Sequence, residues 1–277
     1  MRFLGYDIKK RRQPNYPYTM GLALGGGGAR GFAHAGAIEA LLEVGLRPQI
    51  LAGVSAGSVV AVMHAAGIAP KQMLKLFEKL KFSSLTSLGM PKGGLFGLEK
   101  FQDFLHKNIP YDRLEQLPVP TVVCATDFEK GRKVAFTEGP LPEVVAASCC
   151  IPIAFKPIEI DGVRYVDGGV LANLPCWAIR DKCRFLMAVN VSPLIERPVA
   201  NTLIDMSMRS YELITKNNTT DDMAMADMLI CTNDIAQYKV FDLKGIKEVY
   251  RSGYRDTMRN LQSRGIDTAR RQAQKKS

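Results

Sequence analysis

Two short apolar runs near the start of the chain each lead into glycine and then into a helical pattern. The first, MGLAL at 20–24, runs into four glycines, and apolar residues at helical spacing continue to about Gly45. The second, PQILAGV at 48–54, precedes a helical run at 56–66. Consecutive strands joined through helices lie parallel, because each helix carries the chain back along the sheet. The sequence therefore predicts an α/β fold.

The later segments predict a mixed sheet. The run PIEI-DG-VRYV at 157–166 is two alternating stretches joined by Asp-Gly, which indicates an antiparallel hairpin. Residues 83–99 have the composition of a loop that could act as a lid or interfacial patch. Further strands are expected at 119–127, 133–139, 184–191 and 227–231, and helices at 70–82, 98–109, 142–151, 200–217 and 245–263.

Composition indicates a globular cytoplasmic protein. The chain has 277 residues, of which 47% are hydrophobic and 23% are charged. Its longest apolar run, at 59–69, is shorter than the roughly 18–20 residues that span a bilayer. No apolar stretch of secretory length follows the N-terminal basic cluster, so no signal peptide is expected. The six cysteines lack metal-ligand spacing, so we expect reduced thiols and no metal site.

The net charge of +10 is concentrated at the two ends. Residues 1–18 hold five Lys or Arg and one Asp, and residues 244–277 hold ten Lys or Arg and three acidic residues. We expect a basic arm at 1–18 and one domain at 19–277 that ends in a basic helix. Basic ends attract anionic surfaces, so peripheral contact with the inner membrane surface is one interpretation, and solvated termini are the other. Nucleic acid is not expected without a recognised motif, and no feature assigns an oligomeric state.

GVSAGS at 53–58 contains the pattern G-x-S-x-G, with Gly53, Ser55 and Gly57. This pattern marks a serine on a sharp strand-to-helix turn, where its neighbours must lack side chains. An apolar strand directly before it and a helical run directly after it supply the expected context. Ser55 is therefore a candidate nucleophile, and the alternative is a helix-capping serine in an ordinary turn.

LGGGGARG at 24–31 presents several backbone N–H groups at the start of a helix, which is a natural anion cradle. A dinucleotide-binding loop would require an acidic residue at the end of the next strand, and RPQILAGVS has none. A phosphate-binding P-loop would end in Gly-Lys-Ser/Thr, whereas this loop ends in Ala29-Arg30-Gly31. An oxyanion hole for an acyl intermediate is the interpretation that remains. Arg30 either braces the loop or lies near an anionic headgroup.

The chain has three histidines, and none lies beyond residue 106. An α/β-hydrolase places its histidine late in the chain, so that triad order is excluded. His64 and His106 fall in helical runs and are interpreted as packing or surface residues. His34, one turn after the glycine loop, stays a candidate base.

Ser55 is then expected to use a carboxylate as its base. Asp161 is explained by the hairpin turn. Asp127 ends a strand and is the second candidate. Asp167 ends the strand VRYV and begins DGG, whose glycines allow a close approach, so Asp167 is the preferred base.

Three motifs in order resemble the patatin-like phospholipase family: GGGARG at 26–31, GVSAG at 53–57 and VDGG at 166–169. ATDFEKGRKVAFTEG at 125–139 and AASCCIPIAFKPIEIDG at 146–162 add to the resemblance, which covers roughly residues 20–255. Ala154 and Ala172 depart from the family pattern, which bears on substrate fit more than on catalysis.

The resemblance implies a three-layer α/β/α sandwich with a mixed, mostly parallel sheet. It also implies a Ser55–Asp167 dyad that hydrolyses acyl esters of lipids without metal or cofactor. The positions that match the family motifs are Gly26, Gly27 and Gly28 for the oxyanion hole, with Arg30, Gly31, Gly53, Gly57, Gly168 and Gly169 in support.

The expected chemistry is attack by Ser55 while Asp167 accepts its proton. A free Asp titrates near pH 4 and is too acidic to be an efficient base at pH 7. We therefore expect partial burial to raise the pKa of Asp167. An acyltransferase with the same dyad and a non-catalytic regulatory protein on this fold are the alternatives.

The C-terminal helix has two stripes. Lys244, Lys247, Arg251, Arg255 and Arg259 form a basic one, and Ile246, Tyr250, Tyr254, Met258 and Leu261 form an apolar one. The apolar stripe is expected to dock on the domain's own sheet, and the basic stripe could hold the helix on anionic membranes.

Overall fold

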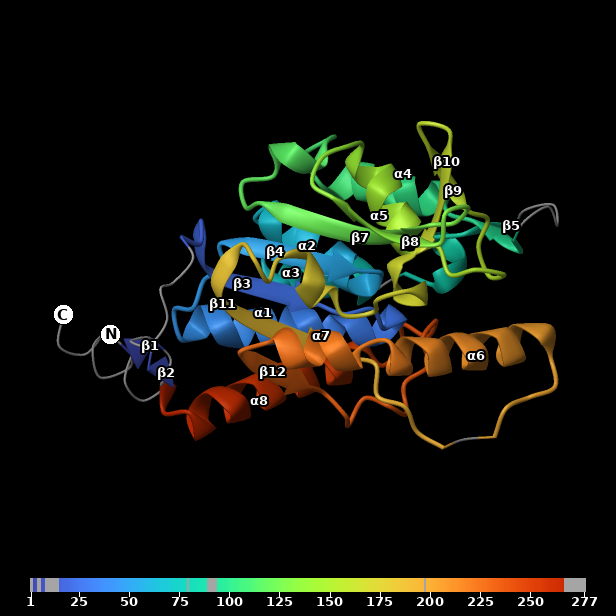
Figure 1. Ribbon diagram of the computed structural model, residues 1–277. Coiled ribbons are helices and arrows are strands. Elements are labelled where there is room, and N and C mark those ends of the chain that lie inside the picture. The colour runs from blue at the N-terminus through green and yellow to red at the C-terminus, as the bar shows by residue number, and fades with distance from the viewer. Residues whose placement is uncertain are drawn as a thin grey trace.

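The computed structural model describes residues 2–3, 6–7, 15–78, 80–88, 94–196 and 198–266. Its centre is an eight-stranded sheet in the order β12-β11-β3-β4-β7-β10-β9, with β8 also paired to β7 (Figure 1). The strands are β3 (Tyr18–Leu24), β4 (Ile50–Val54), β7 (Thr121–Asp127), β8 (Arg132–Phe136), β9 (Ile158–Ile160), β10 (Val163–Asp167), β11 (Cys183–Asn190) and β12 (Met228–Cys231).

The sheet is mixed, as the hairpin pattern predicts. Strands β12, β11, β3, β4 and β7 run parallel, whereas β8, β9 and β10 pair antiparallel. Asp161 and Gly162 have φ angles of 51° and 74° at the β9–β10 turn. Two consecutive positive φ angles fit a tight hairpin turn, so the role expected for Asp161 is confirmed.

Helices cover the sheet where the apolar periodicity predicts them. They are α1 (Phe32–Glu43), α2 (Ala56–Ala65), α3 (Pro70–Glu78), α4 (Glu99–Asn108), α5 (Leu141–Ser148), α6 (Leu203–Asn217), α7 (Thr220–Met225) and α8 (Ile246–Ser263). Helix α3 is shorter than the expected 70–82, and α7 was not predicted.

The 83–99 segment is more ordered than a loop. It contains β5 (Ser87–Leu88) and β6 (Phe96–Gly97), which pair antiparallel, and Leu85 is buried. Residues 89–93 of this segment lie outside the described residues. At the N-terminus, β1 (Arg2–Phe3) pairs antiparallel with β2 (Tyr6–Asp7). The rest of the predicted basic arm up to residue 14, and the basic end beyond residue 266, are also outside them.

The two faces of the sheet carry side chains of different size. Leu22, Leu51 and Met187 point toward one core, which α1, α2, α3, α5 and α8 complete. Ala23 and Ala188, one residue along their strands, point to the other face, which the segment after β10 and α7 cover. Because successive side chains of a strand alternate, the buried strands support a layer on each side. The fold is therefore a three-layer α/β/α sandwich.

Helix α8 packs along α1, where two glycines bring the helix backbones together. A Cβ on Gly36 of α1 would come closer than 3.0 Å to the Tyr250 carbonyl oxygen, and one on Gly253 of α8 would do the same to the Ala33 carbonyl oxygen. The apolar stripe of α8 is buried, as expected, except for the half-buried Tyr254, but α8 packs mainly on α1, and its main contact with the sheet is at β12. The stripe predicts which face of α8 is buried. The close packing of that face against α1 depends on Gly36 and Gly253.

We expect Gly253→Ala to destabilise the protein by about 1–3 kcal/mol, because the added methyl group overpacks the α1–α8 contact. Alanine is the better helix former by about 1 kcal/mol, so any loss must come from packing. Chemical denaturation measures the difference. Arg251→Ala on the exposed side of α8 is the control and should change stability by no more than about 0.5 kcal/mol. A Gly253→Ala protein as stable as wild type would contradict the close packing.

Candidate active site

The strand register brings Ser55 and Asp167 to the two sides of β7. Val54, the last residue of β4, pairs with Cys124, and Asp167, the last residue of β10, pairs with Ala125. The backbones that carry the two residues are therefore about two strand spacings apart, or about 10 Å. A serine and an aspartate side chain that extend toward each other can close this gap.

Ser55 lies on a strained turn that neighbouring groups hold in place. Its φ and ψ are 52° and −127°, a conformation that L-residues rarely adopt. The Ser55 N–H donates to Ser148 Oγ at 2.9 Å, and Ser148 Oγ donates in turn to the Cys124 carbonyl at 2.6 Å. The Ser55 carbonyl accepts from the Ser58 hydroxyl at 2.6 Å. Ser148 thus ties the turn to both α5 and β7.

Atoms of the surrounding chain lie close to each of the motif glycines. A Cβ on Gly57 would come closer than 3.0 Å to the Leu24 carbonyl oxygen, so this residue must be glycine for the turn to lie against β3. A Cβ on Gly28, Gly53 or Gly168 would also come closer than 3.0 Å to backbone atoms, whereas one on Gly26, Gly27, Gly31 or Gly169 would come that close to side-chain atoms.

The glycine loop after β3 lies directly against the serine. A Cβ built on Gly26 would be 3.2 Å from Ser55 Cβ. The Gly26 N–H donates to the Asn173 carbonyl at 3.0 Å, whereas the N–H groups of Gly27 and Gly28 donate to no group among the described residues. Two of the three expected donors, Gly27 and Gly28, therefore line a cavity at Ser55 and have N–H groups with no acceptor among the described residues.

Asp167 is fully buried at the end of β10. Its Oδ1 accepts the Gly169 N–H at 2.8 Å, while no bond of ordinary geometry reaches Oδ2 from the described residues. Burial raises the pKa of Asp167 from 3.8 to about 6, against the opposing effects of the Gly169 N–H and then the Ser55 and Tyr211 hydroxyls. At pH 7 the carboxylate is mostly ionised, and it is more basic than an exposed one.

The other candidate bases have different partners. His34 is buried, and its Nε2 donates to the Gly25 carbonyl at 2.7 Å. Burial lowers the pKa of His34 to about 4, so a neutral ring braces the glycine loop. The Asp127 carboxylate accepts the Lys130 N–H and Arg132 Nε, both at 3.0 Å, and belongs to the β7–β8 turn. His106 is an exposed residue of α4 that pairs with Asp112.

Arg30 is buried and holds three segments together. Its guanidinium donates to the carbonyls of Tyr238 at 2.8 Å and Ala236 at 3.2 Å, and it lies 3.9 Å from Glu212 of α6. These bonds support the bracing role of Arg30 over the headgroup role.

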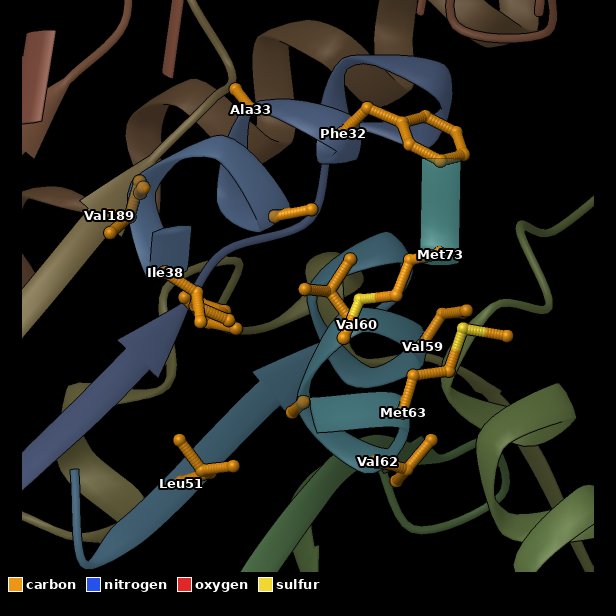
Figure 2. Packing of buried hydrophobic residues seen from close by; sticks show 14 of the residues in the cluster. Phe32, Ala33, Ile38, Leu51, Val59, Val60, Val62, Met63, Met73 and Val189 are labelled. Atoms are coloured by element: carbon orange, nitrogen blue, oxygen red, sulfur yellow. The ribbon is translucent and has the colours of Figure 1, made fainter. Parts of the chain in front are cut away.

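Two cavities meet at Ser55. The larger, of about 140 Å³, is almost entirely apolar, and Figure 2 shows Val59, Val60 and Met63 of its wall gathered near Phe32 and Met73. The smaller, of about 30 Å³, is more polar and also contains Gly27, Gly28, Asn173, Ser192 and Tyr211. Ser55 therefore lies between an almost entirely apolar cavity and a smaller one with a larger polar share in its walls, which we call the polar cavity.

Several residues of this site carry no motif that a sequence pattern could detect. Tyr211 lies in the middle of α6, and Ser192 follows β11. Ser148 lies within a segment that resembles the family and Asn173 lies shortly after VDGG, but their bonds to Ser55 and Gly26 appear only in three dimensions. No group of three metal-ligating side chains occurs in the described part of the chain. Within the same residues, none of the helices has both the length and the apolar content needed to cross a bilayer.

We expect Asp167→Asn to stabilise the protein at pH 7. The native carboxyl binds its proton more tightly than the unfolded one, so stability falls as pH rises from about 4 to about 6. Above that range the ionised carboxylate costs the fold about 3 kcal/mol, which asparagine removes. Denaturant unfolding at pH 7 and pH 4 should show a gain of about 1–3 kcal/mol that shrinks at the lower pH.

Asp127→Asn is the matched control. A backbone N–H and Arg132 lower the pKa of this carboxyl, so its loss should destabilise at pH 7. If Asp167→Asn did not raise the free energy of unfolding at pH 7, the ionised Asp167 carboxylate would not destabilise the fold.

Known proteins resemble this chain in sequence and in fold. A family model described as patatin-like phospholipase matches residues 22–179. An uncharacterized NTE family protein of Mycobacterium tuberculosis is 39% identical over 156 residues, which is 56% of this chain and 43% of that protein. The neuropathy target esterase of Drosophila melanogaster is 27% identical over 201 residues, or 68% of this chain and 14% of that protein. The chain thus spans less than half the length of these relatives.

A solved structure supports the architecture. VipD from Legionella pneumophila superposes with a TM-score of 0.61 at 16% identity, covering 90% of this chain and 67% of that one. This likeness concerns the fold. Since the family model covers more than half of the sequence, the chain belongs to the patatin-like phospholipase family.

Proposed function

We propose that this protein is a serine hydrolase that cleaves acyl esters of lipids, with Ser55 as the nucleophile and Asp167 as the general base. The observation that carries the proposal is the position of Ser55 at the junction of an apolar and a polar cavity, with free N–H groups beside it. An ester of a long acyl chain likewise has an apolar part, the acyl chain, and a polar part at the ester group.

In the first step Ser55 Oγ attacks the ester carbonyl carbon while its proton passes to Asp167. The carbonyl oxygen gains the negative charge and is bound by the N–H groups of Gly27 and Gly28. Each such donor is worth about 3–4 kcal/mol in comparable sites. The tetrahedral intermediate then breaks its bond to the leaving alkoxide, which takes the proton from Asp167. An acyl-enzyme on Ser55 is left.

In the second step water attacks the acyl-enzyme and gives its proton to Asp167. The new intermediate expels Ser55 Oγ, which recovers that proton, and the fatty acid is released. The same acyl-enzyme could pass its acyl group to an alcohol, so product analysis with an added acceptor separates hydrolysis from acyl transfer.

In this proposal each of the two cavities binds a different part of the substrate. The apolar cavity, walled by α1, α2 and α3, would take the acyl chain, since burial of each methylene contributes about 0.8 kcal/mol. The polar cavity beside Asn173 and Ser192 would take the leaving group. Its small size favours a leaving group that extends outward.

Labelling with an alkyl fluorophosphonate tests the nucleophile. We expect wild type to be labelled and Ser55→Ala to be unreactive, because the probe forms its bond with the activated serine. Asp167→Asn should slow labelling by about 10²–10⁴-fold through loss of the base. Ser263→Ala, at the exposed end of α8, and Asp127→Asn should react like wild type. Undiminished labelling of Ser55→Ala would overturn the assignment.

We also propose peripheral contact with anionic membranes through the basic end of the chain. The basic stripe of α8 is exposed, but several members pair with acids, among them Lys247 with Glu78 and Arg255 with Asp234. This pairing weakens the attraction that the charge alone implies.

Sedimentation with vesicles measures this contact. We expect more protein to pellet with vesicles containing anionic lipid than with zwitterionic ones, and the difference to disappear at high salt because charge attraction is screened. Arg251→Glu should reduce the pelleted fraction, since it reverses a charge on the exposed stripe. Equal pelleting with both vesicle types would remove the membrane proposal.

A further inference from the structure

Helix α6 covers the turn that follows Asp167. This turn, η4 (Gly168–Val170), continues directly from the aspartate. Asn218, at the end of α6, donates to the carbonyls of Gly169 at 2.8 Å and Val170 at 3.3 Å, and its Oδ1 accepts the Asn173 N–H at 3.0 Å. The end of α6 is therefore fixed to the aspartate turn by two hydrogen bonds and to Asn173, just after the turn, by a third.

The inner face of α6 forms part of the wall of the polar cavity beside Ser55. Tyr211 lines that cavity together with Glu212 and Thr215, whereas Leu213 and Ile214 on the same helix are exposed. Glu212 is occupied by Arg30 and Arg209. Tyr211 therefore brings a phenol hydroxyl to the aspartate turn.

The position of that hydroxyl explains the second glycine of DGG. A Cβ on Gly169 would come closer than 3.0 Å to Tyr211 Oη and would be 3.1 Å from Asp167 Oδ1. The phenol oxygen, the carboxylate oxygen and Asn173 Oδ1, which would also be closer than 3.0 Å, thus lie around the same point, and a side chain at position 169 would force a neighbour to shift.

We propose that Tyr211 is a positioning residue for Asp167: its hydroxyl donates to the buried carboxylate and, together with the Gly169 N–H, holds it in the ionised form facing Ser55. This inference rests on the proposed function, since it assigns a role within the same dyad. It concerns a residue outside the 22–179 segment that carries the family motifs.

The electrostatics of the site agree with this role. Burial and then the charge of Asp167 raise the pKa of Tyr211 well above its ordinary value, so the phenol keeps its proton and acts as a donor. The charge of Asp167 also acts on the thiols of Cys149 and Cys150, which follow α5: burial and then this charge raise the pKa of each. The thiols are neutral at pH 7, so the Gly169 N–H and the hydroxyls of Ser55 and Tyr211 stabilise the carboxylate charge.

Tyr211→Phe removes the hydroxyl and keeps the ring. The rate constant for fluorophosphonate labelling of Ser55 is measured between about pH 4.5 and about pH 9 for both proteins. We expect the midpoint of the acidic limb to move up by about half to one pH unit, with a loss of about threefold to tenfold at pH 5 that largely disappears at pH 9. A role limited to packing would lower the rate equally at every pH and leave the midpoint in place, which would overturn the inference.

Tyr254→Phe is the matched control, because its hydroxyl also donates to a carboxylate, Glu43, at 2.6 Å, but on the far helix pair α1–α8. Its midpoint should equal that of wild type. A shift of the same size in Tyr254→Phe would show that the effect is not specific to Asp167 and would also overturn the inference.

A second measurement does not depend on activity. Denaturant unfolding gives the stability change caused by Asp167→Asn as a function of pH, once in the wild-type background and once in the Tyr211→Phe background. We expect the stabilisation by Asp167→Asn to develop over a pH range whose upper end is higher by the same half to one unit when the Tyr211 hydroxyl is missing. If this shift occurs while wild type is never labelled, Tyr211 supports Asp167 but the hydrolase proposal falls. If wild type is labelled and neither readout shifts, the role of Tyr211 falls alone.

Discussion

The backbone of Ser55 has a conformation that serine rarely adopts, and several groups of the site fix it in that conformation. The Ser148 hydroxyl bonds the Ser55 N–H on one side, and the Ser58 hydroxyl bonds its carbonyl on the other. Gly57 lets the turn lie against β3, and β7 supplies the carbonyl that anchors Ser148. A strained residue persists only where its surroundings over-determine it. The parallel strands β3, β4 and β7 are therefore part of the nucleophile's support.

The burial of Asp167 has two opposite consequences, one for catalysis in the proposed dyad and one for stability. It keeps Asp167 basic enough to accept a proton near neutral pH, and it makes the ionised carboxylate a destabilising element of the fold. An exposed aspartate would be stable but a poor base. Burial of apolar side chains on the two faces of the sheet opposes this cost.

Sequence reasoning predicted the features that depend on local spacing. The strands around the glycine loop, the Asp161 hairpin and the motif positions follow from periodicity and from turn chemistry. It did not predict α7, the packing of α8 against α1, or the contributions of Ser148, Asn173 and Tyr211. These depend on contacts between segments distant in the chain, and a hydroxyl or amide side chain carries no mark of its future partner. Gly169 is an example: the glycine is visible in the DGG motif, but the side chain that would lie closest to a Cβ there, Tyr211, comes from α6.

The order of strands has a consequence for how this domain can be divided. The family motifs end before residue 179, yet β3, which leads into the glycine loop, is flanked by β4 on one side and by β11 on the other. Without residues 183–190, β3 would become an open edge with unpaired backbone groups, and without α8 the helix α1 would lose the neighbour that covers it. The stretch that defines the family is thus not a self-sufficient module. The residues that follow it are a structural requirement for the motifs that precede them, which limits where such a domain can be cut, fused or exchanged between relatives.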